Sequence, residues 1–181
     1  LSLLFNLPSG TLMNTIVRRF AIIEGDIALI PIGPNARDGY AKVDKDLADL
    51  DEKSWCMVNG YAGTTLNGKL TYMHHVIYGK PSKGYVIDHI NRNKLDNTYA
   101  NLRQITQAQN RMNSTARKSK SLYKGVSYDK ANKKWFTFIK ANGKYIWIGR
   151  FKHEAEAALA YNTQAIKYHK EFAVLNKVER A

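Results

Sequence analysis

Three residues whose types could do chemistry together lie within one short stretch: Asp88, His89 and Asn110. A carboxylate oxygen and a neutral amide oxygen suit Mg²⁺ or Mn²⁺ better than a thiophilic metal. A histidine that is neutral at physiological pH can take a proton from an attacking water. Asn101 precedes the next apolar run, where its side chain can tie the loop to backbone groups and hold His89. The pattern indicates a metal-dependent site.

A plainer interpretation of the same stretch remains open at this point. Its loop is rich in residues that favour turns for purely structural reasons, namely Asn91, Asn93, Asp96 and Asn97. The residue types and their spacing do not decide between turn chemistry and a metal site.

The elements that must position these residues can be read from the apolar runs around them. Residues 85–87 and 102–105 predict two short strands, and the segment that carries Asn110 predicts a helix with Thr106 as its N-cap. Strand, loop, strand and helix would then bring the acid, the histidine and the amide to the ends of neighbouring elements.

Two further residues are kept as neighbours of this site, His74 and Arg103. His74 and His75 fall in a predicted short helix, residues 74–78, and adjacent helical residues do not share a face. The pair is therefore a poor chelator, and His75 is expected to pack or to be solvated.

The segment before the site predicts a small β-rich scaffold. Residues 17–31 read as strand, turn and strand, and residues 44–51 as a short helix with Leu47 and Leu50 on one face. Residues 61–66 and 69–73 flank Asn67-Gly68, which tolerates the positive φ angles of a tight hairpin turn.

The segment after the site predicts a three-stranded sheet and one helix. The strands are expected at residues 123–128, 134–141 and 145–151, and an alanine-rich helix at residues 152–170. The apolar stripe of that helix is predicted to comprise Ala155, Ala158, Leu159, Ala165 and Ile166.

Period-2 alternation sorts the residues of these strands onto two faces. The face toward the helix is predicted to hold Trp135, Thr137, Ile139, Ile146 and Ile148. The other face holds Lys134, Phe136, Phe138, Lys140, Tyr145, Trp147 and Arg150. Aromatic side chains mixed with lysine suit sugar–phosphate and base edges, although packing of these rings on the first part of the chain remains an alternative.

The charge of the chain is uneven along its length. The net charge is +13 overall, with −2 in residues 1–60, +8 in residues 61–120 and +7 in residues 121–181. A basic surface of this kind favours a polyanionic partner, although a merely soluble basic protein is the alternative. The short basic run at residues 117–120 lies in a predicted linker, where it either follows phosphates or is simply solvated.

The remaining composition excludes several classes. Cys56 is the single cysteine, which excludes a disulfide framework and a cysteine-based zinc site and fits a reducing, intracellular setting. No apolar run is long enough to span a membrane. Residues 1–12 precede Met13, and we expect them to be an extension or a gene-start artefact.

The stretch from Asp88 to Arg103, followed by Asn110, resembles the HNH endonuclease motif in the form found in phage and intron-encoded homing endonucleases. The lead-in Tyr72-Met-His-His-Val-Ile is also similar. The resemblance implies a ββα-metal unit that binds one divalent ion and hydrolyses a phosphodiester in DNA. It also implies a cytoplasmic setting, in a bacterial or phage-infected host cell. It implies that His89 is the general base and that Asp88 and Asn110 are metal ligands. Asn101 would be the middle asparagine that holds the structure.

The segment from Tyr123-Lys-Gly-Val to Asn176 resembles the Apetala-two/ERF DNA-binding domain, which lays a three-stranded sheet in the major groove. Matching positions imply DNA contacts by Lys124, Lys140, Tyr145, Trp147 and Arg150. Two arginines of that family are replaced here by Ser127 and Tyr145. Because arginine makes the bidentate contact to guanine, the GC-rich specificity of that family is not expected.

The sequence as a whole predicts an α+β protein with a β-rich N-terminal part, a ββα-metal unit, and a three-stranded antiparallel sheet packed on one helix. The predicted domains are a nuclease domain at residues 13–113, a basic linker at 114–121, a DNA-binding domain at 122–176 and a tail at 177–181. We expect a homing-type endonuclease that uses Mg²⁺, with Mn²⁺ as the alternative, and nicks double-stranded DNA as a monomer or weak dimer. The rival interpretations are a non-catalytic DNA-binding regulator and an RNA-binding protein.

Overall fold

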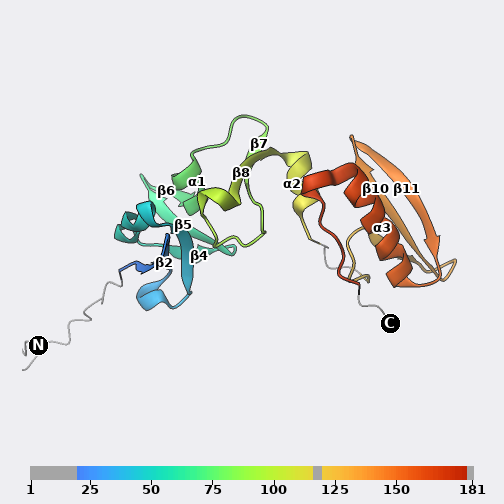
Figure 1. The fold of residues 1–181 in the computed structure, drawn as a ribbon, viewed down its shortest axis with the longest axis horizontal. Helices are drawn as coiled ribbons and strands as arrows, with labels where there is room; N and C mark the ends of the chain where they lie inside the picture. The colour runs from blue at the N-terminus through green and yellow to red at the C-terminus, as the bar shows by residue number, and fades with distance from the viewer. Residues whose placement is uncertain (1–19, 116–119, 179–181) are drawn as a thin grey trace, which may run out of the picture. The chain divides into compact units, whose positions relative to one another are not determined.

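The computed structural model describes residues 20–115 and 120–178, and it confirms the predicted α+β class (Figure 1). The chain divides into two compact units, residues 1–73 with 95–98, and residues 74–94 with 99–181. The predicted extension at residues 1–12 lies outside the described residues. The central positions 116–119 of the predicted linker and the end of the predicted tail lie outside them as well.

The first unit is built on two antiparallel sheets. One has the order β1-β2-β3, formed by Ile22–Glu24, Ile27–Pro31 and Tyr40–Asp44. Side chains alternate between the two faces of a strand, so every second residue of β2 and β3 points into the core. These fully buried residues are Ala28, Ile30, Ala41 and Val43. We did not predict β3.

The second sheet of this unit contains the hairpin predicted at Asn67-Gly68. Its order is β4-β5-β6, from Cys56–Val58, Tyr61–Leu66 and Lys69–Tyr72. Asn67 and Gly68 have φ angles of 50° and 73°, as a tight turn of this kind requires.

The helix predicted at residues 44–51 is a 3₁₀ segment, η2 (Lys45–Glu52), which changes conformation at Leu47. Asp44 ends β3 instead of starting the helix. Leu50 is buried as expected, and its carbonyl accepts a hydrogen bond of 2.7 Å from the indole Nε1 of Trp55. A shorter 3₁₀ turn, η1, spans Pro34–Ala36.

Residues 95–98 extend the edge of the first sheet. The Lys42 amide donates to the Leu95 carbonyl at 2.7 Å, and the Asn97 amide donates to the Lys42 carbonyl at 2.7 Å. Asn97 is 1% exposed. The loop that follows the predicted Asp88-His89 site is therefore fixed to β3 by backbone hydrogen bonds.

The second unit begins with the short helix α1 (Met73–Tyr78) and a hairpin. The strands are β7 (Tyr85–His89) and β8 (Leu102–Thr106), with the 3₁₀ turn η3 (Tyr99–Asn101) just before β8. Helix α2 (Gln107–Asn113) follows β8 directly. This is the predicted order of strand, loop, strand and helix.

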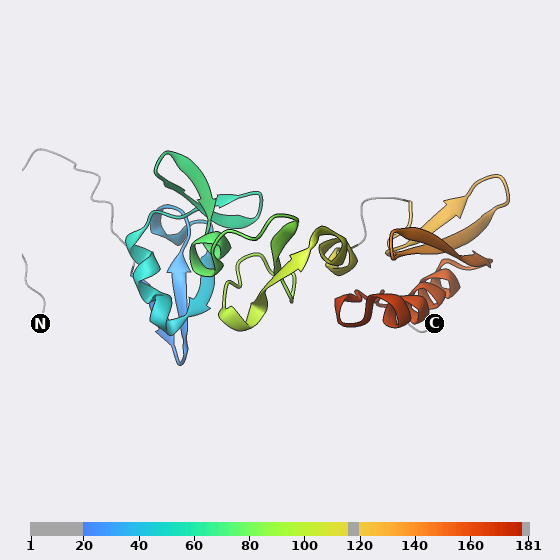
Figure 2. The ribbon, with the colours of Figure 1, turned by 90° about the horizontal axis from the view of Figure 1, so that it is seen from above.

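The rest of the second unit is a three-stranded antiparallel sheet, in the order β11-β10-β9, with one helix on one face (Figure 2). The strands are β9 (Val126–Asp129), β10 (Lys134–Ala141) and β11 (Lys144–Phe151). Helix α3 (Glu154–His169) continues into the 3₁₀ turn η4 (Lys170–Phe172).

The predicted inward face of this sheet is confirmed. Thr137 and Ile139 are 0% and 1% exposed, and Ile146 and Ile148 pack on the cluster of Ile139 with two α3 residues. Trp135 packs on a second cluster with Val126.

The predicted stripe of α3 is partly wrong. Ala158 and Ala165 are fully buried, but Leu159 and Ile166 are 54% and 59% exposed. The helix face toward the sheet is instead made of Ala157, Ala158, Tyr161, Ala165 and His169. Small residues allow close approach, and the ring of Tyr161 fills the space above Gly125, where an added Cβ would meet the ring at 2.2 Å.

In the described part of the chain, no helix has the length and apolar character needed to cross a membrane.

Candidate active site

The site is built on the β7–β8 hairpin and on the helix that follows it. Asp88 pairs with Arg103 and His89 with Leu102 across the antiparallel strands. Helix α2 begins with a capping box, in which the Thr106 hydroxyl accepts from the Gln109 amide at 3.2 Å and the Gln109 side chain accepts from the Thr106 amide at 2.9 Å. This cap satisfies two amides at the helix start and fixes its direction. The last turn of α2 therefore reaches the end of β7.

Asp88 is the centre of the hydrogen-bond network at that point. It is 7% exposed, and its Oδ2 accepts from Arg103 Nε at 3.0 Å. The Nδ2 atom of Asn113, in the last turn of α2, lies 3.0 Å from Oδ1 and 2.9 Å from Oδ2. The same Nδ2 lies 3.1 Å from the His89 carbonyl oxygen. A buried carboxylate needs such partners, because an unpaired buried charge is strongly destabilising.

His89 is 5% exposed and lies against His74. The two ring centroids are 5.2 Å apart, with an angle of 84° between the planes. Burial, and then the nearby His75 and His89 rings, lower the pKa of His74 to about 3. His74 is therefore uncharged at physiological pH and presents a neutral ring edge to His89. The structure thus places His74 beside His89.

Asn101 makes a contact of the kind predicted for it. Its side-chain Oδ1 accepts from the Asn91 amide at 2.9 Å, and its carbonyl accepts from the Ile90 amide at 2.9 Å. Asn101 itself is 7% exposed. These two bonds hold the backbone of the two residues that follow His89.

Arg103 links Asp88 to the end of the chain. Its guanidinium lies 4.3 Å from the centre of the Phe172 ring in η4, while its Nε donates to Asp88. Among the described residues, its Nη2 is buried without a hydrogen-bond partner. Arg103 thus keeps the two N–H groups of Nη2 without an acceptor among these residues beside the acid.

Asn110, the amide expected beside Asp88, lies half-buried on α2, one turn before Asn113. The amide in hydrogen-bond contact with Asp88 is that of Asn113, which the sequence reasoning did not select. Residues three apart on a helix share a face. The three-residue spacing of Asn110 and Asn113 was therefore the feature of the sequence that could have indicated a second amide near Asp88.

The residues predicted to contact DNA fall into two groups. Lys134, Lys140, Tyr145, Trp147 and Arg150 lie exposed on β10 and β11. Lys124 lies apart from them, because its ammonium donates to the Met112 carbonyl at the end of α2. Burial, and then the charge of Arg92, lower the pKa of Lys124 to about 8.

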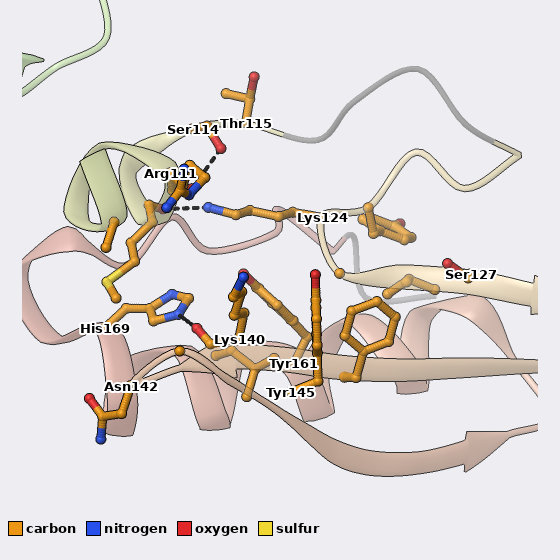
Figure 3. Close-up of a pocket in the computed structure, with 18 residues that line it drawn as sticks. Arg111, Ser114, Thr115, Lys124, Ser127, Lys140, Asn142, Tyr145, Tyr161 and His169 are labelled. Carbon is orange, nitrogen blue, oxygen red and sulfur yellow. Dashed lines mark hydrogen bonds between the residues drawn. The ribbon is translucent and has the colours of Figure 1, made fainter. Parts of the chain in front are cut away.

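A cleft of about 590 Å³ lies in this unit between α2 and the C-terminal sheet (Figure 3). Arg111, Lys124 and Lys140 contribute cations to its lining, and Phe138 and Tyr145 contribute rings. His169 lies at its edge, where the Nε2 atom is 3.0 Å from the Lys140 carbonyl oxygen.

An antiparallel hairpin and a helix that gather an acid, a histidine and an amide define a site of the ββα type. Residues 72–112 match the family model described as HNH endonuclease. The chain is also 35% identical, over 179 residues, to a protein of Acanthamoeba polyphaga mimivirus named as an uncharacterized HNH endonuclease. That alignment covers 95% of this chain and 91% of the relative. No solved structure matches the chain.

The chain therefore belongs to the HNH endonuclease family. It is a nuclease, an enzyme that hydrolyses phosphodiester bonds and acts on DNA. Nucleases of this family generally use a divalent metal ion.

No three acidic, histidine or cysteine side chains converge as a metal site in the described part of the chain, so an ion here would rely on Asp88, amide oxygens and water. Oδ1 of Asp88 accepts one hydrogen bond, from Asn113, and keeps a lone pair for a metal. Two neighbouring ligands in the octahedral shell of Mg²⁺, with bonds of about 2.0–2.1 Å, lie about 2.9 Å apart. The amide nitrogen of Asn113 lies 2.9 Å and 3.0 Å from the two Asp88 oxygens. A half-turn of that amide would bring its oxygen toward Asp88 and would break the contacts of Nδ2 to Asp88 and to the His89 carbonyl, so a bound ion would have to replace them.

Proposed function

We propose that the protein is a homing-type endonuclease that nicks double-stranded DNA with one bound Mg²⁺, with Mn²⁺ as a substitute. The observation that carries the proposal is the buried contact of Asp88 with Asn113 and Arg103, directly beside His89. One nuclease site per chain suits a monomer or weak dimer that cuts one strand at a time.

The proposed roles follow from the positions of the side chains. Asp88 would hold the ion together with an amide oxygen of α2, from Asn110, Asn113 or both. His89 takes the proton of the attacking water, because it adjoins Asp88 and the ring beside it, His74, is uncharged. The bound ion stabilises charge on the phosphate and on the leaving 3′ oxygen.

Asn101 and Arg103 support this arrangement in different ways. Asn101 is a positioning residue, since its bonds fix the backbone after His89. Arg103 orients Asp88 through Nε, and the N–H groups of its buried Nη2 would have to become accessible before they could bind a phosphate oxygen.

We further propose that the C-terminal sheet domain chooses where the enzyme cuts. Its topology of three antiparallel strands on one helix agrees with the Apetala-two/ERF resemblance, and its open face carries both cations and rings. Lys134, Lys140, Tyr145, Trp147 and Arg150 are the proposed DNA contacts on that face. Lys124 is proposed as a contact that must first leave the Met112 carbonyl.

Conversion of supercoiled plasmid to nicked circles tests the nuclease proposal. The wild type should nick with Mg²⁺ and not with EDTA, whereas His89→Asn should lose about 100-fold or more of the rate, as loss of a general base does. The matched control is His153→Asn, because His153 is exposed at the N-cap of α3 and asparagine is a good capping residue. Equal nicking by His89→Asn and His153→Asn would refute the assignment of the base. Linear product without nicked circles would refute single-strand cutting.

A further inference from the structure

Four aromatic rings are packed together on the open face of the β10–β11 hairpin. Phe136 and Trp147 are stacked with centroids 5.7 Å apart and planes at 19°. Phe136 and Phe138 are stacked at 6.4 Å and 23°, and Phe138 meets Tyr145 edge-on at 5.3 Å. We call these four residues the ring platform.

The ring platform does not form part of the core of its own domain. Helix α3 covers the opposite face of the sheet, where Thr137 and Ile139 are buried. Tyr145 is 68% exposed and Trp147 is 56% exposed. An irregularity in pairing between Thr137 and Phe138 brings Phe138 opposite Trp147, so that the platform continues across both strands. Large rings held together at the surface in this way suggest a binding site.

Two cations lie beside the ring platform, and one of them, Arg150, also pairs with Asp129 through Nη2 at 3.3 Å. Lys140 Nζ lies 5.1 Å from the centre of the Tyr145 ring, and the Arg150 guanidinium lies 5.6 Å from that of Trp147. The platform also continues into the cleft beside α2, where Lys140 and Tyr145 project from the sheet (Figure 3). Positive charge beside stacked rings is complementary to a nucleic-acid backbone that carries bases on one side.

The chemistry of the platform favours unpaired bases over a closed duplex. In a duplex groove, a protein meets the edges of the bases and reads them with hydrogen-bonding side chains. The flat faces of the bases are available only where the strand is unpaired, and aromatic side chains stack on those faces. Tyr145 and Ser127 stand at positions where the Apetala-two/ERF resemblance would place arginines, so two of the usual groove-reading groups are missing from this sheet.

We propose that the ring platform binds single-stranded DNA, with bases stacked on Trp147 and Tyr145 and phosphates beside Arg150 and Lys140. The inference deepens the targeting role proposed above and rests on it. The C-terminal domain then recognises DNA that is unpaired near the cut, and the duplex is left to the nuclease site.

The test measures binding by fluorescence anisotropy, using the full chain in EDTA so that no cleavage occurs. The probes are a labelled 20-nucleotide DNA strand, the same sequence as a duplex, and the same sequence as RNA. The DNA strand should bind tightest. Trp147→Ala should weaken that binding about tenfold or more, as loss of one stacked base does. Trp147→Phe should restore most of it, because phenylalanine keeps a flat ring.

Leu159→Ala is the matched control, since Leu159 is 54% exposed on α3, which covers the other face of the sheet. It should bind the strand like the wild type. Tighter binding of the duplex, tighter binding of the RNA, or equal binding by Trp147→Ala and Leu159→Ala would each overturn the proposal. Plasmid nicking by the same preparations separates the two ideas. If the plasmid is nicked but the single-stranded probe is not bound preferentially, only the platform inference fails. If the single-stranded probe is bound but the plasmid is not nicked, the nicking proposal is refuted.

Discussion

The contact between Asn113 and Asp88 makes a prediction that does not depend on cleavage. In Asn113→Ala, the buried carboxylate loses the donor that lies 3.0 Å and 2.9 Å from its oxygens, and the His89 carbonyl loses a donor at 3.1 Å. A hydrogen bond to a charged group contributes about 1.5–3 kcal/mol. Arg103 still pairs with Asp88. We therefore expect unfolding in EDTA to become easier by about 2–3 kcal/mol, measured by urea denaturation.

Asn113→Asp separates a structural role from metal binding. Without metal, two carboxylates then share one buried site, so this variant should be less stable than Asn113→Ala. With Mn²⁺ the order should reverse, because the added carboxylate oxygen is a good ligand. Calorimetric titration with Mn²⁺ should show binding weakened about tenfold or more in Asn113→Ala and retained in Asn113→Asp.

Asn110→Ala is the control for the stability measurements in EDTA, because Asn110 lies on the same helix and is only half-buried, and in the Mn²⁺ titration it tests which amide is the ligand. It should leave stability in EDTA nearly unchanged. The reasoning is refuted if Asn113→Ala keeps both the stability and the Mn²⁺ affinity of the wild type. Loss of Mn²⁺ binding in Asn110→Ala alone would make Asn110 the amide ligand and leave Asn113 with no part in the metal site.

Three further predictions follow from single contacts. The pKa of His74 is about 3 in the folded protein, below its ordinary 6.5, so His74 takes up its proton mainly in the unfolded chain and the free energy of unfolding should fall by about 2 kcal/mol at pH 5. Urea unfolding at pH 5 and pH 7 should show a smaller pH dependence in His74→Gln, and an unchanged pH dependence would contradict this prediction. Arg103→Met should raise the Mn²⁺ affinity measured by calorimetry, because it removes the positive charge beside Asp88, and it should slow nicking on the order of 100-fold. Weaker Mn²⁺ binding in this variant would argue against the prediction. Gly125→Ala should lower the thermal unfolding midpoint far more than Gly143→Ala. Both glycines have a φ angle of 76°, but only at Gly125 would an added Cβ meet an aromatic ring, that of Tyr161, at 2.2 Å. Equal decreases in the midpoint would show that the backbone angle alone matters.

The elements around the site could be predicted because local chemistry determines them. Thr106 is a strong capping residue with a glutamine three positions on, and Asn67-Gly68 permits a tight turn in any context. In contrast, Tyr40–Asp44 is short and carries Lys42 and Asp44 among its apolar residues. Its strand conformation depends on pairing with β2, which precedes it in the chain, and with residues 95–98, which lie far away in sequence.

The stripe of α3 and the role of Asn113 could not be predicted for related reasons. Alanines occur on several faces of α3, so the spacing of its apolar residues does not show which face meets the sheet. The close packing of Tyr161 against Gly125 fixes the face that does. Asn113 resembles any polar residue at the end of a helix. Only the hairpin geometry, which brings the last turn of α2 back to the end of β7, shows that its amide lies against Asp88.

The backbone bonds between β3 and residues 95–98 have a consequence for how this enzyme can be divided. The chain leaves the hairpin after residue 94, contributes Leu95 and Asn97 to the first sheet, and returns to the hairpin at residue 99. The β-rich part is therefore tied into the loop that follows His89, and a fragment that starts at Met73 leaves that loop without its strand partner. Exchange of the C-terminal sheet domain should preserve the fold around His89, whereas removal of the β-rich part should not. We therefore expect the proposed targeting part to be replaceable and the β-rich part to be needed by the nuclease site.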